Sequence, residues 1–234
     1  TYTLSGRPKT ITDAAGHVTQ YIYDSVGQLT KILYNGKPVV YHYDAFGRLV
    51  SKTFNNGVQV DYQYDSYNRL SHLQYFNNAR DKKLITGFDY QYQKKGNLIE
   101  RIRTNQAGKK AQEHYQYDQD NNLSYYSCSG ALCPRDQLGN IIQSQQYKFD
   151  QLNNIASIES AMSTPKGQSE ANTTTYHYDQ QNIPTRLSYY QNTNSSYGQK
   201  SEVLQYDADG NIKYDDQGNT LTYSPFDQTL SVST

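Results

Sequence analysis

The 234-residue sequence contains no tryptophan, one methionine and six phenylalanines, and hydrophobic residues make up only 35% of it. Globular chains are typically about 45–50% apolar, so this composition cannot build an aliphatic core of ordinary thickness. Tyrosine, with 25 residues, is left to fill that role. Because a tyrosine ring buries an apolar face while its hydroxyl reaches water or a hydrogen-bond partner, the composition favours thin, wetted sheets with few helices.

The sequence also lacks a charge excess and a long apolar run. Lys+Arg and Asp+Glu number 22 each, so there is no basic stripe of the kind that neutralises phosphates. No apolar run approaches the roughly 18 residues that a membrane-spanning helix needs, and the N-terminus has no hydrophobic signal segment. We therefore expect neither nucleic acid as a partner nor a membrane span.

Cysteine is almost absent, and the two residues present, Cys128 and Cys133, fit neither a disulfide framework nor a zinc spacing. They lie five residues apart around Gly130, which permits either a small-loop disulfide or two free thiols. We favour free thiols, and the redox compartment stays open.

What the sequence does contain is one short unit that recurs along the chain. The unit is Tyr, any residue, Tyr, Asp, two residues, Gly or Asn, one residue, and then Leu or Ile. It is clearest at 21–29, 41–49 and 62–70, and looser copies follow at 90–98, 115–123, 147–155, 176–184 and 205–212. The clearest copies are 20 and 21 residues apart, about the length of one β-hairpin. We expect residues 1–234 to be a single repeat array and a fragment of a larger protein.

Each unit predicts two strands and two turns. Residues 58–64 alternate strictly, with Val and Tyr on one face, as is typical of a half-buried strand. Asp at the first turn position, with Gly or Asn three residues later, predicts a type I turn closed by a left-handed residue. The Asn-Gly pairs at 35–36 and 56–57 predict two-residue hairpin turns. The polar stretches 159–175 and 191–200 interrupt the rhythm and are predicted to be long loops.

A single hairpin is marginal in water, so neighbouring units must stack edge to edge. The predicted fold is all-β: an elongated antiparallel ribbon of β-hairpin repeats, which sheet twist coils into a spiral. The residues that we assign to the structural repeat motif are Tyr23, Asp24, Gly27, Tyr43, Asp44, Gly47, Arg48, Leu49, Tyr64, Asp65, Asn68, Arg69, Leu70, Tyr117, Asp118, Asp150, Tyr178, Asp179, Tyr206, Asp207 and Gly210.

The unit written out at 41–49 resembles the RHS/YD repeat of bacterial polymorphic toxins, insecticidal toxin complexes and the animal teneurins. The segments 127–136, 149–155 and 206–223 also look like the RHS region of the toxin-complex C component. This resemblance implies an RHS-type spiral shell that encloses a C-terminal toxin. The implied partners are the remainder of the shell, that toxin domain and other toxin-complex subunits. The implied location is secreted, or delivered to a target cell by a bacterial secretion or toxin-complex system.

Catalysis is not expected, and we assign no catalytic, cofactor-binding or metal-binding residue. The Asp of each unit recurs too often to be a catalytic carboxylate, because a catalytic pair needs only two special residues. Asp207, Asp209 and Asn211 have the oxygen spacing that opens a calcium loop, but the rest of that loop fails and a plain turn is favoured. His42 and His177 are predicted on the polar, solvated face of their strands.

One competing interpretation is a binding module. Rows of Tyr with neighbouring Asp, Asn and Gln on an outer face could then engage glycans or a cell surface, since aromatic rings stack on sugars.

Overall fold

The computed structural model describes residues 1–78, 80–179, 183–199, 201 and 203–233. Within these residues the chain is almost entirely antiparallel β-strand, and its single helical element is the 3₁₀ turn η1, Ser195–Tyr197. The prediction of an all-β hairpin ribbon is therefore confirmed. The chain divides into two compact units, one of Thr1–Glu113 with Gly130–Leu132 and one of His114–Ser129 with Cys133–Thr234.

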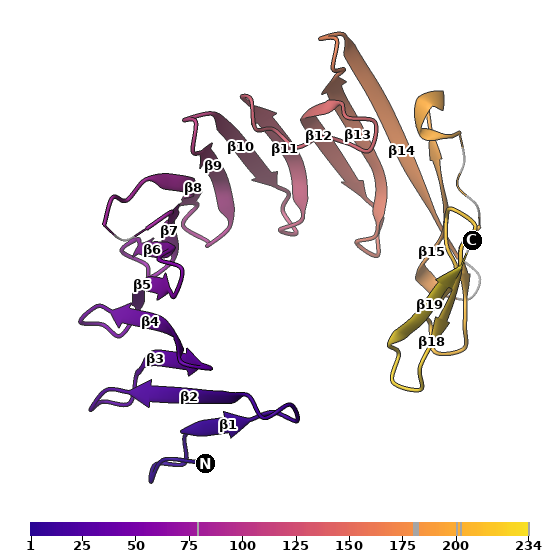
Figure 1. Ribbon diagram of the computed structural model, residues 1–234. Coiled ribbons are helices and arrows are strands. Elements are labelled where there is room, and N and C mark those ends of the chain that lie inside the picture. The colour runs from indigo at the N-terminus through magenta and orange to yellow at the C-terminus, as the bar shows by residue number, and fades with distance from the viewer. Residues whose placement is uncertain (79, 180–182, 200, 202, 234) are drawn as a thin grey trace. The chain divides into compact units, whose positions relative to one another are not determined.

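The first unit is a sheet whose strand order follows the sequence (Figure 1). Each strand from β1 to β9 pairs antiparallel with its chain neighbours. Its strands are β1 (Thr10–Thr12), β2 (Val18–Tyr23), β3 (Leu29–Tyr34), β4 (Lys37–Tyr43), β5 (Leu49–Phe54), β6 (Gln59–Tyr64), β7 (Leu70–Phe76), β8 (Leu84–Tyr92), β9 (Leu98–Asn105) and the beginning of β10 (Lys110–Tyr117).

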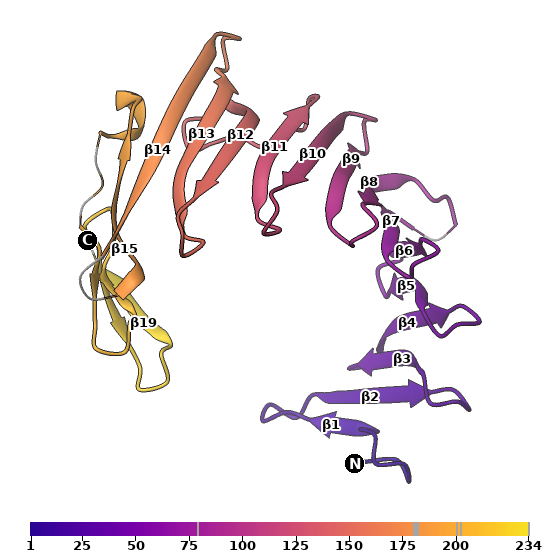
Figure 2. The ribbon, with the colours of Figure 1, turned by 180° about the vertical axis from the view of Figure 1, so that it is seen from behind.

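The second unit holds the end of β10 and two groups of strands. The strands β11 to β15 again follow the order of the sequence, and β16 to β19 form a separate four-stranded sheet (Figure 2). These strands are β11 (Leu123–Ser129), β12 (Ile141–Phe149), β13 (Ile155–Ser163), β14 (Ser169–Asp179), β15 (Ile183–Asn192), β16 (Gln205–Tyr206), β17 (Ile212–Tyr214), β18 (Thr220–Tyr223) and β19 (Thr229–Ser233).

The Asp turns have the predicted backbone. At the turn between β4 and β5, the amide of Gly47 donates to the carbonyl of Asp44 at 3.0 Å, and the amide of Asp44 donates to the carbonyl of Arg48 at 2.9 Å. Gly47 has φ of 79°, and Asn68 takes the same position in the next turn with φ of 65°. A left-handed residue thus closes these turns, which explains why only Gly or Asn occupies the position.

The Asn-Gly pair at 35–36 forms the predicted two-residue turn, with φ of 47° and 76°. The same prediction for 56–57 is wrong. There the amide of Phe54 donates to the carbonyl of Val58 at 2.9 Å, so the loop has three residues, as in the Asp turns. A two-residue loop would shift the strand by one residue and turn Val60, now 2% exposed, to the other face.

The predicted loop at 159–175 is also wrong, because its residues complete β13 and begin β14, joined by a short turn around Gly167 with φ of 79°. The segment was predicted to be a loop because most of its residues are polar. In a thin sheet wetted on one face, Ser, Thr and Asn are acceptable strand residues, and Thr favours strands. The predicted loop at 191–200 begins two residues later than predicted, because Gln191 and Asn192 end β15. It is confirmed from 193 to 199, and residue 200 lies outside the described residues.

The hydrophobic core is thin, as the composition predicts. The described side chains that are buried and hydrophobic are Val60, Ala111, Tyr126, Cys128, Cys133 and Met162. Most tyrosines are half-buried instead, so the stability of the sheet depends on contacts between neighbouring hairpins more than on a central core.

The expectation of free thiols is wrong, because Cys128 and Cys133 form a disulfide with 5.8 Å between their Cα atoms. Cys128 lies near the end of β11, and Gly130 follows with φ of 106°, a backbone that side-chain-bearing residues rarely adopt. The sharp change of direction brings the two sulfur atoms together, which the spacing alone could not decide.

Gly47→Val should lower the free energy of unfolding by about 1–2 kcal/mol more than Gly47→Asn, because a β-branched residue resists positive φ and Asn accepts it. A Cβ at this position would meet only the end of the flexible Gln28 side chain, at 2.9 Å, in both variants. Urea denaturation measures the difference. Equal midpoints for the two variants would contradict the left-handed turn.

Candidate functional site

Where the repeat motif has Tyr directly before its Asp, the tyrosine hydroxyl can reach the backbone of the preceding hairpin. Phe149 takes this position before Asp150 and has no hydroxyl. Tyr43 donates to the carbonyl of Leu29 at 2.9 Å, and Tyr64 donates to that of Leu49 at 2.9 Å. The same bond recurs in both units, from Tyr23 to Pro8, Tyr92 to Leu70, Tyr178 to Ile155, Tyr206 to Leu187 and Tyr223 to Ile212. We call this bond the tyrosine tie.

The tyrosine tie reaches a carbonyl beyond the end of a strand ladder. The last pair between β5 and β6 is Ser51 with Asp61, and Leu49 lies two residues past it. Tyr64 is the last residue of β6, directly before the following turn, where the register between β6 and β7 shifts by a bulge. A carbonyl without a partner costs about 1–3 kcal/mol when it is shielded from water, so the tyrosine satisfies a group that the ladder leaves out.

The aspartate of each motif holds its own turn. Oδ1 of Asp44 accepts from the amides of Phe46 at 2.9 Å and Arg48 at 3.0 Å. The other motif aspartates that make this pair of bonds are Asp24, Asp65, Asp150 and Asp207. Asp118 accepts from the amide of Asn122 at 2.8 Å. Residues 180–182, which follow Asp179, lie outside the described residues.

Sequence reasoning missed three further copies of this turn. In the first, Oδ1 of Asp13 accepts from the amides of Ala15 and His17, both at 2.9 Å. Asp136 and Asp215 accept the same pair of amide bonds, although no Tyr-x-Tyr precedes them. The signal that could have found them is Asp, two residues, Gly and Asn, present at 136–140 and 215–219. Asn105 makes the equivalent bonds without a charge, to the amides of Ala107 and Lys109, both at 3.0 Å.

Arginine adds a second link between consecutive hairpins. Nε of Arg48 donates to Oδ2 of Asp44 at 2.7 Å, and the guanidinium lies 4.8 Å from the ring centre of Tyr64 in the next hairpin. Arg69 repeats the arrangement with Asp65 and with Tyr92, whose ring centre is 4.7 Å away. The arginine therefore binds its own turn and covers the tyrosine that ties the next one.

Asparagine takes the place of arginine in the second unit. Nδ2 of Asn154 donates to Oδ2 of Asp150 at 2.9 Å and to the carbonyl of Pro184 at 3.0 Å. Asn211 likewise bonds Asp207 at 3.2 Å and reaches Oδ1 of Asp227 at 2.9 Å. Both side chains thus join an aspartate turn to a later segment.

These bonds change the titration of the groups involved. The backbone amide of Arg48 and its guanidinium hold the pKa of Asp44 below the ordinary aspartate range, and the amides of Asn211 and Asp209 do the same for the pKa of Asp207. Burial raises the pKa of Tyr43 and Tyr92 above the ordinary tyrosine value, so both hydroxyls stay protonated donors further into the alkaline range.

The sequence also raised a calcium loop at 207–211 and two histidines, His42 and His177, as possible sites, and the structure shows what each of them contacts. Asp207 uses its oxygens to accept bonds from residues 209 and 211, as the plain turn predicts. No group of three His, Cys, Asp or Glu side chains in the described part of the chain could hold a metal ion. His42 is exposed as predicted, whereas His177 is half-buried and stacks on Tyr189 with ring centres 4.3 Å apart. None of the described helices could span a membrane.

The repeated turns and ties define an antiparallel β-repeat protein in which each hairpin binds its neighbours. The RHS-repeat family model matches residues 2–39 and 43–80. No curated protein matches the sequence. The two matched segments are RHS repeats, and the same aspartate turns recur in the rest of the described chain.

Two crystal structures share the fold. The structure of TcdB2-TccC3 aligns with 97% of this chain at 15% identity and a TM-score of 0.60. The structure of TcdB2-TccC3 without its hypervariable C-terminal region aligns with 99% of this chain at 17% identity and a TM-score of 0.50. This chain covers only 15% and 12% of the length of those chains.

Tyr64→Phe should lower the free energy of unfolding by about 1–2 kcal/mol, because it removes only the hydroxyl that ties Leu49. Tyr67→Phe is the matched control, since Tyr67 lies in the adjacent turn and is 67% exposed, and its loss should stay within about 0.5 kcal/mol. Chemical denaturation of both variants provides the comparison. If Tyr64→Phe were as stable as the parent, the tie would have no energetic role.

Stability should fall in acid because the pKa of several turn aspartates is lowered in the folded chain. An unfolded aspartate has a pKa of about 3.9, so the unfolded chain takes up protons first as the pH drops. The stabilisation is complete above about pH 4 and is lost as the pH falls through the lower folded pKa values.

Denaturation at a series of pH values between neutral and acid tests this dependence. Asp44→Asn is the informative variant, because Asn105 shows that an amide can make the same turn bonds without titrating. Its stability should depend less on pH than that of the parent. If the stability of Asp44→Asn fell with pH as much as that of the parent, protonation of Asp44 would not contribute to the loss of stability in acid.

Proposed function

We propose that this chain is a segment of an RHS shell that encloses a C-terminal toxin domain and helps to deliver it. The observation that carries the proposal is the tyrosine tie, which joins a hairpin to the preceding one by the same bond at several positions in both units. A chain built in this way extends a continuous surface instead of closing a compact core, and enclosure requires surface.

The likeness to TcdB2-TccC3 supports a position for the enclosed toxin domain on the C-terminal side of the repeats. One of the two crystal structures lacks a hypervariable C-terminal region, so the complete relative carries such a region. By analogy, the enclosed domain would follow the repeats in the longer protein to which this chain belongs. The proposed partners are the remainder of the shell, the enclosed domain and other toxin-complex subunits, with delivery from a bacterium into a target cell.

The aspartate turns of the repeats fit a non-enzymatic role for this segment. The carboxylates that recur most often accept amide bonds of their own turns, as Asp44 and Asp150 do. An active site instead needs a unique cluster of perturbed titratable groups in a pocket. We propose that any activity of the complete protein resides outside these repeats.

Protease protection tests enclosure. A protease-sensitive reporter domain is fused after the complete repeat array of the longer protein and, separately, directly after residue 234 of this chain. The free reporter and the thermal melting of both fusions are the controls. Protection of the reporter in the complete array alone is the expected result, because a short open segment cannot surround a domain.

Equal digestion of the reporter in both fusions, with both repeat regions folded, would overturn the shell. The competing interpretation, a repeat module that binds glycans or a cell surface, would then be favoured.

A further inference from the structure

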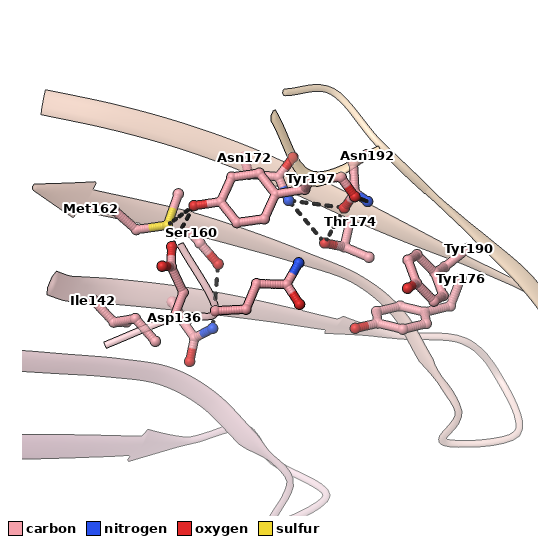
Figure 3. Close-up of a pocket in the computed structure, with 12 residues that line it drawn as sticks. Asp136, Ile142, Ser160, Met162, Asn172, Thr174, Tyr176, Tyr190, Asn192 and Tyr197 are labelled. Carbon is pink, nitrogen blue, oxygen red and sulfur yellow. Dashed lines mark hydrogen bonds between the residues drawn. The ribbon is translucent and has the colours of Figure 1, made fainter. Parts of the chain in front are cut away.

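One pocket of the second unit departs from the repeat pattern. It is about 290 Å³ in volume and lies over one face of β12 to β15. Its lining residues are Asp136, Gln137, Ile142, Gln145, Ser160, Met162, Asn172, Thr174, Tyr176, Tyr190, Asn192 and Tyr197 (Figure 3). The strand register sets Gln145 opposite Ser160, Ser160 opposite Asn172 and Thr174 opposite Asn192, so the floor is a continuous polar row.

The segment after β15 builds the remaining wall and is held firmly. Oδ1 of Asn172, which is 7% exposed, accepts from the amide of Asn194 at 3.1 Å. Nδ2 of Asn192 donates to the carbonyl of Gly198 at 3.0 Å. The hydroxyl of Tyr197 donates to Oδ2 of Asp136 and accepts from Nδ2 of Asn140 at 2.9 Å. The pocket is therefore formed before any ligand arrives, which lowers the cost of binding.

The pocket offers mainly neutral polar groups, and the carboxylate of Asp136 is the one charge among its lining residues. Its twelve lining residues, all within the described part of the chain, include neither Lys nor Arg. Asp136 is the only acid among them, and its carboxylate accepts from Tyr197, from the side chain of Asn140 and from two backbone amides. An anionic ligand therefore finds no cationic partner and meets the Asp136 carboxylate, whereas the neutral amides and hydroxyls can both donate and accept.

Two tyrosine rings close one end of the pocket, and Met162 and Ile142 lie at the other (Figure 3). The ring centres of Tyr176 and Tyr190 are 6.1 Å apart, and their planes are inclined by 50°. Planes at this angle cannot clamp a flat base between parallel faces, but one ring can support the apolar face of a puckered ring. The hydroxyl of Tyr190 is fixed by Oδ2 of Asp216 at 2.7 Å.

We propose that this pocket binds a single neutral sugar ring, free or at the end of a glycan. Gln145 and Ser160, which keep donors and acceptors beyond their bond to each other, meet the sugar hydroxyls, and a tyrosine ring supports the apolar face of the sugar. Asn172, Thr174 and Asn192 bond one another and hold this part of the pocket in shape. The volume is at the lower end of the roughly 300–1,000 Å³ typical of small-molecule sites, which suits one ring and excludes an oligosaccharide. The proposal does not depend on the shell function, because all of these residues belong to the second unit.

Calorimetric titration of the 234-residue chain with glucose, galactose, mannose and N-acetylglucosamine tests the proposal, and a glycan array identifies a terminal sugar. At least one sugar should bind with a dissociation constant of about 1 mM, as expected for a small ligand. Adenosine is included as a neutral flat ligand and should not bind.

Gln145→Ala should weaken sugar binding by roughly tenfold, because it removes a side-chain amide from the floor. Gln146→Ala is the matched control, since Gln146 is the next residue of β12, is exposed and lies on the opposite face. Ser160→Ala provides a second test, and the melting temperature of each variant shows whether it folds.

Three results would overturn the proposal. They are no binding of any of the four sugars or of any array glycan, equal loss of binding in Gln145→Ala and Gln146→Ala, and preferential binding of adenosine. Binding of the sugar only as part of a glycan, with the same response to Gln145→Ala, would support it and assign a glycan terminus as the source.

Discussion

The structure depends on one recurring hydrogen bond, the tyrosine tie from a hairpin to the backbone of the hairpin before it. The turns of Asp24, Asp44 and Asp65 are followed by a bulge, and the next ladder begins two residues further on, as at Leu49 and Ser51. That offset leaves a carbonyl outside the ladder, and the tyrosine beside the following turn satisfies it. The tie thus explains why Tyr and Asp are adjacent in the repeat: one residue joins hairpins and the other shapes the turn.

A chain with so thin a core must distribute its stability. Val60 and Met162 are among the few buried hydrophobic side chains in the described residues, and no central cluster gathers them. The free energy of folding then approximates a sum of hairpin terms and terms between neighbours, as in other repeat proteins. Arg48 and Arg69 stabilise the contacts between neighbouring hairpins by covering the rings of the tying tyrosines. Asn154 also links two hairpins, because its side-chain amide donates to the carbonyl of Pro184. Either arginine or asparagine can link neighbouring hairpins, because the offset between successive strand ladders is the same at these turns.

The turns and the all-β fold could be predicted from sequence because their chemistry is local. Asp and Gly three residues apart specify a turn wherever they occur, and tyrosine alternation specifies the strands. The loop at 56–57 was missed because register, set by burial of Val60, decides the loop length. The Cys128–Cys133 disulfide was missed because backbone direction decides it.

The pocket was beyond sequence reasoning for a further reason: Tyr197 meets Asp136 across 61 residues of chain. Uniform hairpins present much the same surface at every repeat, so a site that recognises one ligand must come from a departure from the repeat. The segment after β15 is such a departure, because it leaves the ladder and crosses the face of the preceding strands. This segment forms a wall beside the polar side chains of β12 to β15, so that part of the sheet surface becomes a pocket. Small-molecule sites are concave, whereas an ordinary solvated sheet face is flat.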